Sequence, residues 1–165
     1  MPRQQREPEY IQEGEREILL EAIQTRIKYL ISDVGILMDH GGQPQIAAAL
    51  YIHAVEEYGK FLYVKSLQAV QGIITIDMNK FTWHDEKIRI AKEALPSDCF
   101  VLKHGSFTSS GFTRSSFNVH EVPDWKTRLT IFNTDIQNGR VEDLPEVNAE
   151  VLRNAVNEFK SHFRI

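Results

Sequence analysis

The segment from about Pro44 to Val70 constrains the fold more than any other part of the chain, because its apolar side chains point all the way round a helix. At about 100° per residue, two opposite sides of that helix are apolar: Ile46, Ala49 and Leu50 on one, and Tyr51, Ala54, Val55, Tyr58 and Leu62 on the other. A helix that is apolar on every side must be covered by neighbouring elements. We therefore expect this segment to be the central helix of the protein.

Apolar periodicity predicts four more helices around it. From about Tyr10 to Asp39, one face of the expected helix carries Ile23, Ile27, Leu30, Val34 and Leu37. Two glycines and a proline in residues 40–44 end this helix and begin the central one. The remaining helices are expected at about 83–95, 124–130 and 147–163.

Two local features lie between the second and third of these helices. The run Ile73–Ile76 is consistent with either a strand or a turn of helix, because periodicity does not distinguish the two over so short a length. Thr82 is expected to be the N-cap of the helix at 83–95, with Asp85 as a carboxylate in its first turn.

The rest of the chain is expected to be irregular. Residues 97–121 are rich in serine and glycine, which is typical of a loop, but their phenylalanines predict that this loop packs against the body. Residues 1–9 are polar, contain two prolines and are expected to be a flexible lead-in. Residues 10–165 are then a single all-α domain, a helical bundle with an irregular Ser/Gly-rich insertion.

Composition limits the classes of function. A net charge of −4 argues against a general binder of phosphate backbones, although a local basic patch would still admit RNA. Cys99 is the single cysteine, so the chain can form neither an internal disulfide nor a cysteine-based zinc site. The polar first residues lack the apolar core of a signal peptide, and no apolar run approaches the ~20 residues of a membrane span. We expect a cytoplasmic protein without a membrane segment or a cofactor.

Four polar residues interrupt the central helix: His53, Glu56, Glu57 and Lys60. At about 100° per residue, Glu56, Glu57 and Lys60 each lie within about 60° of His53 around the helix axis, in line with apolar residues. Since burying a charge is costly unless it is paired, Glu56 or Glu57 should meet Lys60 or a cation from another helix. Glu56 and Lys60 have the favourable i, i+4 order, acid before base. This stripe is either a structural salt bridge or part of a functional site.

His84 and Lys87 are the expected partners of the stripe, because residues three apart near the start of a helix share one face. The helix dipole at that end favours a neutral imidazole that can act as a base. A histidine, lysines and glutamates meeting between helices suit metal-free proton transfer on a phosphodiester, with histidine as the acid or base and lysine stabilising the developing anion.

A metal site is the alternative use of these residues, with His53, Glu56, Glu57 and His84 as ligands. Di-metal helical bundles, however, carry Glu-x-x-His on two helices, whereas this chain has a single His-x-x-Glu. We therefore expect no bound metal.

The run Ala54-Val55-Glu56-Glu57-Tyr58-Gly59-Lys60 resembles the signature of the AbiV family of abortive-infection proteins, a branch of the HEPN superfamily. His84-Asp85-Glu86-Lys87 is similar to the His-x-x-Lys segment that follows it in that family. A third strip of the family signature is matched by Arg128, Phe132, Asp135, Gly139 and Pro145. The resemblance covers about residues 30–163.

This resemblance implies a HEPN-like bundle that forms a homodimer and acts in prokaryotic antiviral defence, on RNA or the translation apparatus. Many HEPN proteins are metal-independent ribonucleases with an Arg-x4–6-His motif, from which this sequence departs. Arg153 has Glu158 where the motif needs histidine, and Arg114 and His120 fall in the Ser-rich loop. Any ribonuclease-like activity would then rest on the stripe, Lys60 included, and on His84 and Lys87. The alternative is a non-enzymatic module that binds a phage or host protein.

Overall fold

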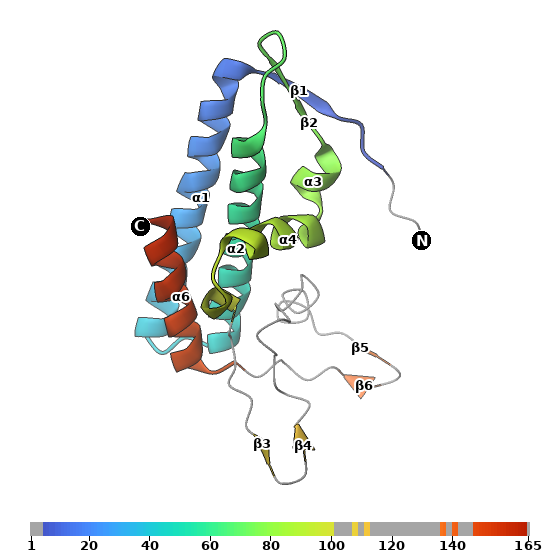
Figure 1. Cartoon of the computed structure of the whole chain (residues 1–165). Coiled ribbons are helices and arrows are strands. Elements are labelled where there is room, and N and C mark those ends of the chain that lie inside the picture. The colour runs from blue at the N-terminus through green and yellow to red at the C-terminus, as the bar shows by residue number, and fades with distance from the viewer. Residues whose placement is uncertain are drawn as a thin grey trace. The chain divides into compact units, whose positions relative to one another are not determined.

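The computed structural model describes residues 5–100 and 147–164, and the backbone of the pairs 107–108, 111–112, 136–137 and 140–141. Over these residues the protein is mostly helical, as predicted (Figure 1). Its helices are α1 (Glu13–Asp39), α2 (Pro44–Ser66), α3 (Met78–Thr82), α4 (His84–Ala94), the 3-10 helix η1 (Ser97–Phe100) and α6 (Ala149–Phe163). Within this part of the chain, no helix combines the length and the apolarity needed to cross a membrane.

Among the described residues, the strands form three antiparallel pairs. β1 (Glu9–Gln12) pairs with β2 (Ile73–Ile76), with Ile11 opposite Ile74. Two short pairs, β3 (Phe107–Thr108) with β4 (Gly111–Phe112) and β5 (Ile136–Gln137) with β6 (Arg140–Val141), lie in or beyond the Ser/Gly-rich stretch. Three features discussed from the sequence lie outside the described residues. They are the helix predicted at 124–130, the pair Arg114 and His120, and the strip made of Arg128, Phe132, Asp135, Gly139 and Pro145.

The chain divides into two compact units, and the division falls within α1 and within α2. The first unit comprises Met1–Lys28 and Ala54–Ala94. Figure 1 shows β1 and β2 alongside each other, with α3 and α4 following β2. The core of this unit is aliphatic and is formed by Ile23, Ile27, Ala54, Val55, Val64, Ile74, Ile76, Ile88 and Ala91, together with Tyr63.

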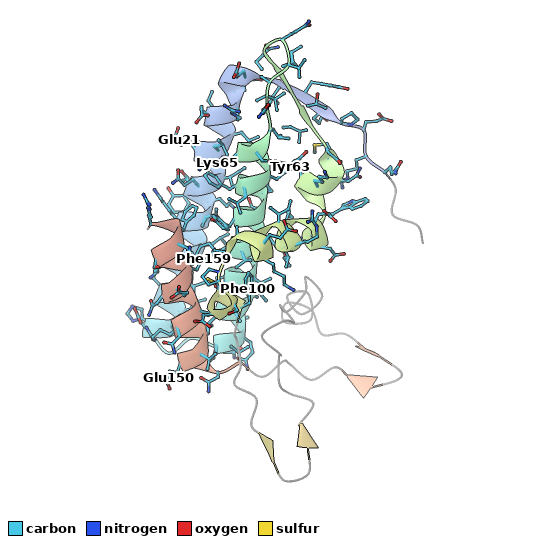
Figure 2. The ribbon with its side chains drawn as sticks, in the orientation of Figure 1. Glu21, Tyr63, Lys65, Phe100, Glu150 and Phe159 are labelled. Carbon is cyan, nitrogen blue, oxygen red and sulfur yellow. The ribbon has the colours of Figure 1, made fainter. Side chains whose placement is uncertain are left out.

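The second unit comprises Tyr29–His53 and Leu95–Ile165. In it, η1 packs against α6, whose first turn is capped by the side chain of Asn148. The rings of Tyr51 and Phe159 meet edge to face at 5.8 Å, and the Tyr51 hydroxyl binds the carbonyl oxygens of Cys99 and Ala155. Figure 2 labels Phe159 and Phe100 among the side chains of this core.

The central helix is buried as predicted: no residue from Pro44 to Val64 is exposed. The apolar face of α1 is confirmed as well, since Ile23, Ile27, Leu30 and Val34 are buried and Leu37 is half-buried. The open choice at Ile73–Ile76 is decided in favour of a strand.

Two local predictions are wrong. The first helix does not begin near Tyr10, because Glu9–Gln12 pairs with β2 and α1 starts only at Glu13. Thr82 is not the N-cap of the following helix. It is the last residue of α3, and its hydroxyl donates to the carbonyl oxygen of Met78, four residues back in the same helix.

Candidate functional site

Glu56 on α2 and the pair His84 and Lys87 on α4 form the centre of the candidate site, within the first unit. Oε2 of Glu56 lies 2.8 Å from Nδ1 of His84 and 3.7 Å from Nζ of Lys87. The exposed fraction of the side chain is 0% for Glu56 and 6% for Lys87, but 39% for His84. A buried carboxylate, paired with a buried ammonium, therefore holds an imidazole that reaches solvent.

The start of α4 brings His84 and Lys87 to this carboxylate. They are the first and fourth residues of α4, so they lie one turn apart on the same face. The helix N-terminus also favours the acidic residues Asp85 and Glu86 that share its first turn. The sequence predicted this meeting of the central helix with the start of the helix expected at 83–95.

Glu57 and Lys60 form a second ion pair beside the first. Nζ of Lys60 lies 2.7 Å and 2.9 Å from the two carboxylate oxygens of Glu57 and 5.0 Å from the ring centre of Phe81. The sequence left open whether Glu56 or Glu57 would meet Lys60, and the structure shows Glu57, three residues back, as its close partner. Glu56 meets a cation from another helix, Lys87, which was the other predicted option.

Gly59 allows α2 and α4 to approach closely between these two pairs. A Cβ atom built on Gly59 would lie 1.8 Å from the carbonyl oxygen of Lys87, far inside any permitted contact. Only glycine therefore fits at this position. We expected no role for Gly59 or Phe81 from the sequence. The signal for Gly59 was a glycine inside a helix, where it costs about 1 kcal/mol relative to alanine and so needs a packing reason.

The structure thus brings five of the six candidate residues together in the first unit: Glu56, Glu57, Lys60, His84 and Lys87. His53, the secondary candidate, is half-buried on α2 and belongs to the second unit. In the described ranges, no group of three or more histidine, cysteine, aspartate or glutamate residues is placed to hold a metal ion. The metal-site alternative therefore gains no geometric support.

Chemically, the arrangement is a carboxylate–imidazole pair. When Nδ1–H of His84 donates to Glu56, the ring is fixed in one orientation and one tautomer, and Nε2 is the atom that would exchange a proton with a ligand. Lys87 supplies a counter-charge to the buried carboxylate, which lowers the cost of keeping Glu56 ionised. Such a pair can act as a general base without a metal.

An open groove also lies in the first unit, with a volume of about 570 Å³. It is lined by Arg16, Glu17, Leu20, Glu21 and Gln24 of α1 and by Phe61 and Lys65 of α2. Glu21 and Lys65 are labelled in Figure 2. None of the six candidate residues lines this groove, and its charged side chains have both signs.

Cys99, in the second unit, is not part of the candidate site. Its side chain has no exposed surface, and burial raises the pKa of the thiol to about 12, with the carboxylates of Glu158 and Asp98 adding to the effect. The thiol is therefore protonated near neutral pH. This supports a structural role for the cysteine.

Comparison of the chain with models of protein families, with curated proteins and with solved structures finds no match.

Proposed function

We propose that this protein is a prokaryotic antiviral protein of the abortive-infection type, similar to the AbiV branch of the HEPN superfamily. It acts on RNA as a metal-independent ribonuclease-like toxin, in the cytoplasm and as a homodimer. One observation carries the catalytic part of the proposal: the fully buried Glu56 holds the half-exposed imidazole of His84 through Nδ1, at 2.8 Å.

In the proposed reaction, Nε2 of His84 takes the proton of a ribose 2′-hydroxyl. The 2′-oxygen then attacks the adjacent phosphorus, the bond to the 5′-oxygen breaks, and a 2′,3′-cyclic phosphate forms. The proton held by His84 is then available to the departing 5′-oxygen. Lys60, with 17% of its side chain exposed, is assigned the stabilisation of the developing negative charge, and the buried Lys87 is the counter-charge to Glu56.

The test compares the purified parent protein with His84→Asn. The asparagine amide can replace Nδ1 as a donor to Glu56, but it cannot exchange a proton, so packing is preserved while the chemistry is removed. RNA cleavage and toxicity in a bacterial host are expected to fall about 10²–10⁴-fold. His40→Asn changes an exposed histidine at the end of α1 and is the matched control. Equal RNA cleavage and toxicity in His84→Asn and the parent would contradict the catalytic proposal.

A second candidate function is a non-enzymatic module that binds a phage or host protein. The close approach of Gly59 to the Lys87 carbonyl favours it, because a residue of the Ala54–Lys60 run here serves to pack α2 against α4. In that case the charges stabilise a helix junction and the binding surface lies elsewhere. Lys60→Met is expected to lose stability under either candidate, so the two differ in the function of this variant at a temperature where it is fully folded. Lost function there supports catalysis, whereas retained function supports the module.

A further inference from the structure

We infer that Gly59 is a positioning residue: its missing side chain sets the distance between α2 and α4 that lets Glu56 hold His84. This inference rests on the proposed role of His84. Its evidence is the geometry of two neighbouring contacts between the same helices, Glu56 with His84 and Gly59 with Lys87.

The two contacts keep the same register. Glu56 and His84 are 28 residues apart, and so are Gly59 and Lys87. The second contact therefore lies three residues, or about one turn, further along both helices than the first. The backbone contact at Gly59 is therefore next to the side-chain contact at Glu56. A change in helix separation at the Gly59 contact is transmitted to the Glu56 contact, since each helix is a rigid element over a single turn.

The size of the effect follows from the distances. A Cβ on residue 59 would lie 1.8 Å from the Lys87 carbonyl oxygen, 2.6 Å from its carbon and 3.1 Å from its Cα atom, and real Cβ contacts are essentially never under 3.0 Å. Even one methyl group would then push the backbones apart by about 1.2 Å. A shift of that size along the line that joins Oε2 of Glu56 to Nδ1 of His84 would lengthen their bond from 2.8 Å to about 4.0 Å, beyond hydrogen-bond distance.

The contact cannot be relieved by a rotamer change, because the atoms that meet the Cβ belong to the α4 backbone. One Cα hydrogen of Gly59 occupies the direction of the missing Cβ and points at the carbonyl oxygen, which is the geometry of a weak Cα–H···O contact. Gly35 and Gly14 on α1 are different, since a Cβ at either would meet nothing within 4 Å. They are matched controls for the effect of replacing a helical glycine.

The experiment measures the imidazole ¹⁵N signals of His84 in the parent, Gly59→Ala and Gly35→Ala, with the fold of each checked by circular dichroism. We expect a single tautomer, protonated at Nδ1, in the parent and in Gly35→Ala. In Gly59→Ala we expect this tautomer to give way to a mixture of both. If the parent cleaves RNA, kcat of Gly59→Ala should fall about 10²-fold with little change in KM. A folded Gly59→Ala with the parent's His84 signals overturns the inference.

If Gly59→Ala does not fold, the parent itself provides the test. Under rising urea, the nuclear Overhauser effect between the Gly59 Cα hydrogens and α4 should disappear together with the bonded His84 tautomer. Persistence of that tautomer after the contact is lost would overturn the inference. Because neither readout depends on RNA, a parent protein without ribonuclease activity would contradict the proposed function and leave this result standing.

Discussion

Nζ of Lys87 lies 3.7 Å from Oε2 of Glu56, and both side chains are almost wholly withdrawn from solvent. The two charges therefore depend on each other: either one left alone in this position would lose its hydration without an equivalent replacement. His84 shares the same oxygen at 2.8 Å, so the carboxylate is also the point that connects the shielded ammonium to the exposed imidazole.

Replacing both members of this buried pair should destabilise the protein by less than the sum of the two single replacements. Lys87→Met is expected to lower the free energy of unfolding by about 3 kcal/mol, because it leaves Glu56 without its buried counter-charge. The double variant Glu56→Gln with Lys87→Met should cost clearly less than the sum of the two single variants. Urea unfolding at pH 7 measures all four proteins, and strictly additive effects would contradict the coupling.

Lys60→Met should cost about 2 kcal/mol of unfolding free energy, since it removes a charged partner from Glu57, whose side chain is only 8% exposed. Lys65→Met is the matched control on the same helix. Lys65 is exposed and lies 5.8 Å from the ring centre of Phe61, so its replacement should cost about 0.5 kcal/mol or less. Thermal unfolding compares the two, and equal losses would show that the Glu57–Lys60 pair is energetically a surface pair.

Stability should fall at alkaline pH in a way that depends on Cys99. Burial raises the pKa of this thiol from 9.0 to about 12, so between these values the folded state holds a proton that the unfolded state has released. The free energy of unfolding therefore decreases as pH rises above about 9, by at most about 1.4 kcal/mol per pH unit from this group. Cys99→Ala should have a shallower decrease from pH 9 to 11. Parallel curves for variant and parent would contradict the prediction.

Arg153→Met should raise the pKa of Asp39 toward its usual value of 3.8. In the second unit, Nη1 of Arg153 lies 2.8 Å from Oδ1 of Asp39, and this hydrogen bond and the charge of the guanidinium lower the pKa of the carboxyl. Such a carboxyl contributes stability above its unfolded pKa, and the contribution is lost as pH falls. The carboxyl carbon shift of Asp39, followed from pH 6 to 2, measures the effect. An unchanged midpoint would show that the ion pair does not persist in solution.

Some features were readable from the sequence because they depend only on the order of residues along a helix. The apolar faces of α1 and α6 follow from a period of 3.6 residues, and the burial of α2 follows from its having no polar side. The need of Glu56 and Glu57 for cations was predictable for the same reason, because a charge in an apolar helix must be paired wherever its partner comes from.

Tertiary structure decided what depends on pairing between distant residues. β1 could not be predicted, since Glu9–Gln12 is only four residues long and its strand partner, Ile73–Ile76, lies more than 60 residues away. The sequence left both Glu56 and Glu57 open as partners of Lys60, and the structure shows that Glu57 is the close one. The need for glycine at position 59 exists only because a carbonyl of another helix arrives there. Local periodicity fixes which faces of a helix are buried, but which atoms meet across two helices is set by their separation and register, and these depend on the packing of the whole unit.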